Sequence, residues 1–381
     1  MKTVGVICEY NPFHTGHKKQ LDTIRVICGE DTGIVCLMSG NYVQRGAPAI
    51  FQKSLRAKAA LLCGADLVLE LPTPYSLSSA EGFAAGGVKI LSGFCDTLCF
   101  GSEAGTAESL MSTASALLKP EFPNILKEQL KSGCSFPSAR AAAIREVGMD
   151  SNLLEKPNDI LAVEYCKAIL QQNSGMLPLV IKREGAYHDE AAQLDNPSAT
   201  AVRNLIGAQQ DFSPYVPEQT VSLYSGAQAH TLSAGERAIL CKLRTMSEEE
   251  FESIPHGSEG LWRKLMHASR SCATLSEIID NVKSKRYTRT RIDRMILCAF
   301  LGITGEILSQ SAPYTRVLGF TDRGRQILKS ARSTGDFPHL GDDTRLPYQA
   351  LERRWDDLYG LFSTGEPEPT GTTASGRICI L

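Results

Sequence analysis

The chain has 381 residues, of which 43% are hydrophobic, and its 40 basic and 42 acidic side chains give a formal net charge of -2. The apolar content is enough for a sizeable core, and the chain is too long for one compact core of usual size. We therefore expect two domains. The charge balance excludes a globally basic nucleic-acid binder but allows a local basic surface.

Targeting and metal signals are weak. No stretch approaches the roughly 20 apolar residues of a membrane-spanning helix, and the start MKTVGVICEY lacks a basic region followed by a long apolar run. We therefore expect a cytoplasmic protein without a membrane partner. Many of the 12 cysteines lie in apolar runs, and the close pair Cys95 and Cys99 has no further ligands nearby, so no metal site is predicted.

Apolar β-rich runs alternate with helical patterns in the first half of the chain. Strands are predicted at 3–8, 33–38, 65–72, 96–101 and 177–183. Helices are predicted from Gly16 onward, at 53–63, 79–91 and 106–118, and over much of 120–180. This alternation is typical of βαβ units and predicts an α/β fold, a Rossmann-like doubly wound parallel sheet over residues 1–210.

The remainder of the chain, residues 211–381, has a different pattern. After the turn-rich segment 211–219 the sequence shows helical pieces and few strand signals, and its last 17 or so residues are rich in turn formers. We therefore predict a second, mainly helical domain with an irregular tail.

The motif His14-Thr15-Gly16-His17 lies where the first predicted strand ends and the first predicted helix begins. Unpaired N–H groups and the helix dipole favour an anion at such a junction, and Gly16 permits close backbone approach. The two imidazoles face the same side of the first helical turn, where they can stabilise a phosphate whose charge grows as it is attacked. We predict catalytic roles for His14 and His17. The alternative is a pair of ordinary turn or surface histidines.

The segment SATAVR (198–203) is a second candidate phosphate site. Ser198 and Thr200 offer hydroxyls and Arg203 offers a guanidinium at the head of a predicted helix, and together these groups can bind a polyphosphate. The alternative is a simple helix cap formed by Ser198.

The segment KSKRYTRTRIDR (283–294) is strongly basic and contains Tyr287. A basic patch with an aromatic side chain suits an RNA backbone and an unstacked base. The alternative is a solvated helix face. The candidate RNA-binding residues are Lys283, Lys285, Arg286, Arg289, Arg291 and Arg294.

A series of blocks in this chain resembles the bacterial tRNA(Met) cytidine acetate ligases, a family of the HxGH nucleotidyltransferase superfamily. The blocks occur in order and cover most of residues 1–300, so the resemblance is far more specific than a His-x-Gly-His motif. SATAVR is also similar to the ISSTxxR signature of other nucleotidyltransferases. The blocks are GVICEYNPFHTGH (5–17), MSGNYVQRGAPAI (38–50), RAKAALLCGADLVLELP (56–72), SAEGFAAGGVKIL (79–91), FGSEAG (100–105), KPNDILAVEY (156–165), IKREGAYHD (181–189) and KRYTRTRIDR (285–294).

The resemblance implies a reaction in two steps. Acetate attacks the α-phosphorus of ATP to give acetyl-adenylate and pyrophosphate. The N4 amine of the wobble cytidine in elongator tRNA(Met) then takes the acetyl group, forming N4-acetylcytidine. ATP is the implied co-substrate, coenzyme A is not needed, and Mg²⁺ with ATP is expected on general grounds.

The resemblance also implies the nucleotide site. Gly101 would allow close approach of the nucleotide, Asn158 would bond its adenine or ribose, and Arg183 would neutralise phosphate charge. Gln20 stands where many members have histidine, and Asp159 stands where asparagine is common, so the contact at residue 20 and the choice between 158 and 159 stay open. The implied ATP site comprises Ile7, Cys8, Glu9, Tyr10, Asn11, Pro12, Phe13, His14, Thr15, Gly16, His17, Lys18, Lys19, Gln20, Gly101, Asn158 and Arg183.

Two other functions fit part of the sequence. A small-molecule adenylyltransferase would explain HTGH and SATAVR, but it gives the helical domain and its basic segment no task. A non-catalytic RNA- or nucleotide-binding module would explain the basic segment, but the presence of both histidines together with Arg203 argues against it.

Overall fold

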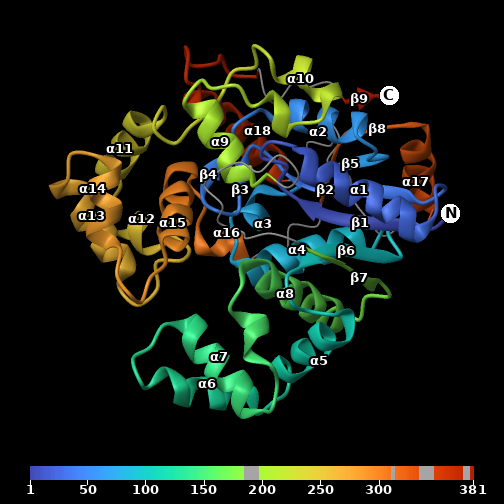
Figure 1. The fold of residues 1–381 in the computed structure, drawn as a ribbon. Helices are drawn as coiled ribbons and strands as arrows, with labels where there is room; N and C mark the ends of the chain where they lie inside the picture. Colours follow the sequence, from blue (N-terminus) through green and yellow to red (C-terminus); the bar gives the residue numbers. More distant parts are fainter. Residues whose placement is uncertain (184–196, 310–313, 334–346, 372–377) are drawn as a thin grey trace.

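The computed structural model describes residues 1–183, 197–309, 314–333, 347–371 and 378–381. Within these ranges, seven strands form one sheet in the order β7-β6-β1-β2-β5-β8-β9 (Figure 1). The sheet strands are β1 (Thr3–Cys8), β2 (Gly33–Ser39), β5 (Leu67–Leu71), β6 (Thr97–Ser102), β7 (Leu177–Lys182), β8 (Arg316–Phe320) and β9 (Cys379–Ile380). A separate antiparallel hairpin consists of β3 (Tyr42–Val43) and β4 (Ala47–Pro48).

The α-helices follow the expected alternation in the first half of the chain and dominate the part after it. The first group is α1 (Thr15–Cys28), α2 (Lys53–Leu62), α3 (Thr73–Ser76), α4 (Ala80–Leu91), α5 (Ala107–Leu117), α6 (Phe122–Leu130), α7 (Phe136–Glu146), α8 (Pro157–Gln171) and α9 (Ala199–Gly207). The second group is α10 (Glu218–Tyr224), α11 (Glu236–Thr245), α12 (Glu248–Glu252), α13 (Leu261–Ser271), α14 (Leu275–Val282), α15 (Arg289–Leu301), α16 (Gly305–Ser309), α17 (Asp322–Ser333) and α18 (Pro347–Tyr359). No helix within the described ranges combines the length and apolarity needed to cross a bilayer.

The central strands are buried on both faces, which explains their continuous apolar runs. Successive strand residues point to opposite faces, so Val35 and Leu37 of β2 pack in the core formed with α4, α5 and α8. Ile34 and Cys36 pack instead with residues of α1 and α2 on the other face. The predicted doubly wound α/β sheet is therefore confirmed.

The order in which strands are added to the sheet reverses between β1 and β6. From β1 the sheet continues through β2 to β5 on one side, whereas β6 and β7 lie on the other side, all with parallel pairing. A crevice opens at such a switch point beyond the carboxyl ends of the strands. The HTGH motif follows β1 directly, so the topology places it at this crevice.

The part of the chain after residue 210 forms a helical lobe and then adds two strands to the sheet. Helices α11 to α15 gather into a lobe beside the sheet, at the left of Figure 1, and their apolar core also includes Tyr42 of β3 and Trp355 and Tyr359 of α18. The chain then returns, and β8 pairs antiparallel with β5 while β9 pairs parallel with β8. These two strands lie in the region for which we predicted helices and an irregular tail. Their pairing partners are far away in sequence, so local patterning gave no signal for them.

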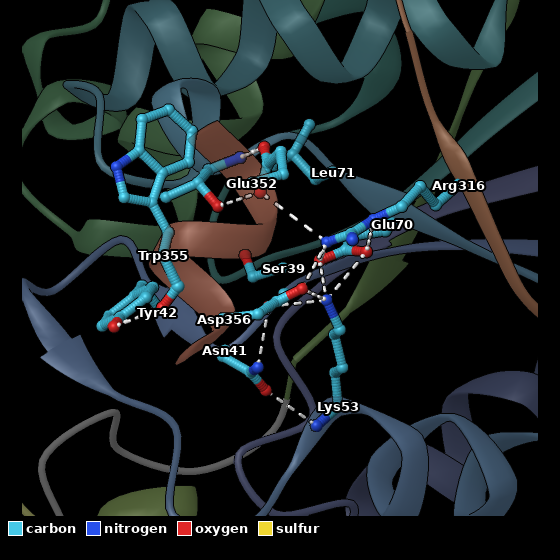
Figure 2. A network of polar contacts seen from close by, with 12 residues as sticks. Ser39, Asn41, Tyr42, Lys53, Glu70, Leu71, Arg316, Glu352, Trp355 and Asp356 are labelled. Carbon is cyan, nitrogen blue, oxygen red and sulfur yellow. Dashed lines mark hydrogen bonds and ion pairs between the residues drawn. The ribbon is translucent and has the colours of Figure 1, made fainter. Parts of the chain in front are cut away.

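A buried network of charged side chains fastens this returning segment to the sheet (Figure 2). The ammonium of Lys53 on α2 lies 2.9 Å from Glu70 Oε1 on β5 and 2.6 Å from Asp356 Oδ2 on α18. Arg316 of β8 donates from Nε to Glu70 Oε2 at 2.6 Å and lies 3.0 Å from Asp356 Oδ2. The side chains of Lys53, Glu70 and Asp356 are almost fully buried. The network therefore joins four elements, α2, β5, β8 and α18.

We expect Glu70→Gln to lower the free energy of unfolding at pH 7 by about 3–5 kcal/mol, because it removes the carboxylate shared by the buried cations Lys53 and Arg316 and leaves Asp356 to compensate both. Burial opposes ionisation of Glu70, but Arg316 and Lys53 outweigh burial and lower its pKa from 4.5 to about 2. The stabilisation is therefore fully present above pH 4.5 and is lost as the pH falls toward 2. Urea unfolding across this pH range measures both effects, and the acid slope should become flatter in the variant.

A matched control is Asp22→Asn, which breaks the exposed ion pair of Lys18 and Asp22 on α1. Exposed pairs contribute about 0–1 kcal/mol, so this variant should unfold close to the wild type. Equal losses for Glu70→Gln and Asp22→Asn would contradict the assigned role of the buried network.

Candidate functional site

A cavity of about 240 Å³ lies at the carboxyl ends of β1 and β6. It is bounded by the ends of these strands, the start of α1, the turn of the β3–β4 hairpin, α8 and the segment before and within α9. Most of the predicted site residues line it, namely Ile7, Cys8, Glu9, Tyr10, Asn11, His14, His17, Gln20, Gly101, Asn158, Arg183, Ser198, Thr200 and Arg203.

Six residues of the predicted ATP site, all from the segment 12–19, are not among those that line the cavity. Phe13 is fully buried and packs edge-on against Tyr10, 4.7 Å between ring centroids. Lys18 pairs with Asp22 at 2.6 Å on the surface of α1. The six residues are Pro12, Phe13, Thr15, Gly16, Lys18 and Lys19.

The two histidines stack on each other, with ring centroids 3.6 Å apart. The backbone N–H of His14 donates to Nδ1 of His17 at 3.2 Å, so His17 carries the proton of its neutral ring on Nε2. Nδ1 of His14 is buried and has no hydrogen-bond partner among the described residues. Both rings therefore keep ring nitrogens available at the cavity.

Burial makes both imidazoles neutral at pH 7. Desolvation is the largest influence on the pKa of His14, and the charges of Arg183 and Arg203 add to it, lowering that pKa to about 3. Burial, His14 and Arg183 likewise hold the pKa of His17 well below its usual range. The arginines that disfavour protonation here also give the cavity a positive potential, which attracts an anion.

The SATAVR segment caps a helix and also lines the cavity, so the helix cap is observed and phosphate binding by this segment stays a prediction. Ser198 Oγ accepts from the N–H of Ala201 at 3.0 Å and caps α9. Arg203, one turn later, donates to the carbonyl of Asn11 at 2.7 Å and to Thr200 Oγ1 at 3.0 Å. These bonds fix the guanidinium beside the loop that precedes His14.

The neighbouring residues Asn158 and Asp159 have different surroundings. Asn158 lines the cavity and donates from Nδ2 to Glu103 Oε1 at 2.5 Å. Asp159 is fully buried and accepts from Ser102 Oγ and from the N–H groups of Glu103 and Ala104, the last two at 2.9 and 3.3 Å. Asn158 thus faces the cavity, whereas Asp159 holds the loop after β6.

Gly101 lies on the cavity wall, where a side chain would collide with Arg183. A Cβ added at Gly101 would lie 2.7 Å from Cδ of Arg183 and 2.8 Å from its Cγ. Glycine at this position therefore makes room for the arginine side chain that crosses it.

The cavity also contains residues that were not among the predicted site residues. Glu103 follows β6, and Gln44 and Arg45 form the tip of the β3–β4 hairpin. All three lie in segments that directly follow a strand, and this position was the available signal. The apolar part of the wall consists of Phe83, Cys99, Phe100, Leu161 and Tyr165, together with Pro197 and Ala199.

The basic segment lies on the helical lobe, and none of its six candidate residues lines the cavity. Arg286 pairs with Glu259 at 2.9 Å and Arg289 pairs with Asp293 at 2.9 Å. Lys283 and Lys285 are exposed. Across the described ranges, no group of three or more His, Cys, Asp or Glu side chains is placed to hold a metal ion.

Comparisons with known proteins identify the family of the chain. The family model described as HIGH Nucleotidyl Transferase matches residues 1–363. The tRNA(Met) cytidine acetate ligase of Clostridium tetani is 39% identical over 363 residues, which cover 89% of each chain. That of Thermosipho africanus is 37% identical over 387 residues, covering 95% of this chain and 91% of the relative. The chain belongs to the tRNA(Met) cytidine acetate ligase family.

Solved structures of Thermotoga maritima TmcAL share the fold over the full length of both chains. The apo form I has a TM-score of 0.92 at 32% sequence identity. Form II, which is bound with alpha-thio ATP, has a TM-score of 0.89 at 31% identity. The family membership therefore extends from the sequence to the arrangement of the whole chain.

For this member of the ligase family, Asn158→Ala and Asp159→Ala should have contrasting effects. We expect Asn158→Ala to weaken ATP binding roughly fivefold with little change in thermal stability, because it removes a polar group from the cavity wall. Asp159→Ala should instead lower the free energy of unfolding by about 1–3 kcal/mol or more, since it leaves buried donors unsatisfied. Calorimetric titration with ATP and thermal unfolding measure the two effects, and the reverse pattern would overturn the assignment.

Proposed function

We propose that this chain is an ATP-dependent ligase that adenylates acetate and transfers the acetyl group to N4 of the wobble cytidine of elongator tRNA(Met). The observation that carries the proposal is the pair of neutral histidines flanked by Arg183 and Arg203 in the switch-point cavity, in a chain 35–39% identical to ligases of this name. Because ATP and tRNA are both substrates, we place the reaction in the cytoplasm.

In the first step, a carboxylate oxygen of acetate attacks the α-phosphorus of ATP, the bond to the bridging oxygen breaks, and pyrophosphate leaves. Negative charge moves onto the phosphate oxygens during this step. Neutral His14 and His17 are suited to donate hydrogen bonds to these oxygens, while Arg183 and Arg203 offset the charge of the triphosphate. Mg²⁺ is proposed to enter as part of the ATP substrate.

In the second step, the N4 amine of cytidine attacks the acetyl carbonyl, the amine loses a proton, and AMP leaves. Adenylation makes this possible because AMP is a far better leaving group than the oxygen of free acetate. No coenzyme A is required, since the energy comes from ATP. We propose that residues 1–210 perform the chemistry and that the helical lobe within residues 211–381 binds the tRNA.

The test supplies ATP, labelled acetate and bulk bacterial tRNA to the full chain. We expect label to enter RNA with ATP and without coenzyme A. Unlabelled RNA accompanied by ATP consumption with another acceptor would favour a small-molecule adenylyltransferase, and no ATP turnover would favour a non-catalytic binding module.

Acetate-dependent exchange of pyrophosphate into ATP isolates the first step, and His17→Ala should slow it by about 10²–10³-fold. Exchange unaffected by His17→Ala would contradict the proposed site.

The basic segment generates a separate prediction for RNA binding. Replacement of Lys285 and Arg289 by glutamine removes two exposed cations. It should weaken binding about equally for tRNAs of different sequence, because phosphate contacts do not distinguish bases. The dependence of log K on log salt concentration should become shallower by about 1 for each phosphate that is no longer neutralised. Filter binding at several salt concentrations measures this slope. Pyrophosphate exchange, which needs no RNA, is measured on the same variant. Parallel loss of both activities would indicate a folding defect instead of an RNA contact.

A further inference from the structure

The turn of the β3–β4 hairpin, residues Gln44 to Gly46, separates the cavity from the helical lobe. On one side, Gln44 and Arg45 line the cavity. The N–H of Gln44 donates to Oε1 of Glu9 at 2.8 Å, which ties the turn to the residue that follows β1. On the other side the turn contacts α15 of the lobe.

The base of the hairpin is anchored to α18 (Figure 2). Asn41 donates from Nδ2 to Asp356 Oδ1 at 2.9 Å, and the hydroxyl of Tyr42 donates to the carbonyl of Trp355 at 2.9 Å. Both side chains are fully buried. The base therefore has a fixed position set by the buried ion network, and the remaining freedom of the hairpin is at its tip.

The tip is held by α15 through two contacts. Arg294 donates from Nη1 to the carbonyl of Gln44 at 3.2 Å. Gly46 has φ +79°, and a Cβ there would lie 2.3 Å from the backbone nitrogen of Arg294 and 2.8 Å from Cβ of Asp293. The helix backbone thus packs directly against the turn, and only glycine leaves room for this approach.

Arg291 and Arg294 are the half-buried basic residues of this segment, but Arg291 donates to the carbonyl of His256 and to Ser258 Oγ within the lobe, whereas Arg294 donates to the hairpin turn. Arg294 follows Arg289 by five residues, which places the two side chains about 140° apart around the helix. Arg289 is exposed, whereas Arg294 is half-buried and its Nε has no hydrogen-bond partner among the described residues. A side chain in this position is poorly placed to contact an RNA backbone.

We infer that Arg294 is a positioning residue for the first half of the reaction, which holds the Gln44–Gly46 turn so that Arg45 and Glu9 keep their places on the nucleotide cavity. This inference rests on the proposed function of the cavity. It reassigns one of the six candidate RNA-binding residues from the acceptor to the ATP side of the reaction. It also gives the cavity a wall whose geometry is set from the helical lobe.

The experiment measures acetate-dependent pyrophosphate exchange, without RNA, for the full-length wild type and for Arg294→Lys. Lysine keeps the charge but loses the planar guanidinium that reaches the Gln44 carbonyl. We expect the KM for ATP to rise about tenfold or kcat/KM to fall by a similar factor, while tRNA binding stays within about twofold of the wild type. If Arg294 instead contacted an RNA phosphate, Arg294→Lys would leave pyrophosphate exchange unchanged.

Gly46→Ala provides a second variant that leaves Arg294 intact. It forces the turn away from α15, so it should raise the KM for ATP in the same way. A general loss of folded protein would lower the apparent kcat without changing KM, which separates instability from positioning. Arg270→Gln on α13 removes an exposed charge of the same lobe and should match the wild type in exchange.

The outcomes separate the inference from the function on which it depends. No exchange by the wild type would refute the proposed function itself. Exchange by the wild type together with unchanged KM for ATP in both Arg294→Lys and Gly46→Ala would overturn the inference alone. A raised KM in both variants, with Arg270→Gln unchanged, would support it.

Discussion

The buried ion network centred on Lys53 and Glu70 is the constraint on which the rest of the fold depends. A buried charge is tolerated only when partners compensate it, and here the partners come from elements far apart in the sequence. Glu70 and Lys53 belong to the first half of the chain, whereas Arg316 and Asp356 arrive only after the helical lobe. The sheet edge at β5 is therefore complete only when the C-terminal segment returns to it, so in the chain the lobe lies between strands of one sheet instead of following the sheet as an independent unit.

The chemistry of the cavity also follows from burial. A solvated histidine pair would share protons near neutral pH, but desolvation and two arginines keep His14 and His17 neutral here. Neutral imidazoles are not repelled electrostatically by Arg183 and Arg203, whereas protonated imidazoles would be. Two cations and two hydrogen-bonding rings can therefore lie together in one small cavity. An entering anion benefits from both, because it meets fixed positive charge and donors that need no reorganisation.

The sequence predicted those features that depend on local pattern. Alternating apolar runs placed β1, β2, β5, β6 and β7 within a few residues, and the position of HTGH after the first strand located the cavity. The strands β8 and β9 escaped prediction because a short strand at a sheet edge is defined by its distant partner. The sequence did not identify Glu103, Gln44 and Arg45 as site residues, and the reason is related. Whether a loop residue lines a cavity depends on its packing against other elements. The basic segment shows the same limit, because composition marks six cations, but only the folded structure shows that Arg294 donates to the carbonyl of Gln44 in the hairpin turn.

The two anchors of the β3–β4 hairpin suggest why the inserted lobe and the cavity share a wall. An acetyl-adenylate is a mixed anhydride, and water competes with the acceptor amine for it, so a cavity with well-positioned walls favours transfer over hydrolysis. The hairpin tip occupies the boundary between the cavity and the lobe proposed to bind tRNA, with Gln44 bonded to Glu9 on one side and to Arg294 on the other. Its base is fixed by the ion network through Asn41. A wall fixed at its base by the ion network and supported at its tip by this lobe makes the geometry of the cavity depend on the position of the lobe.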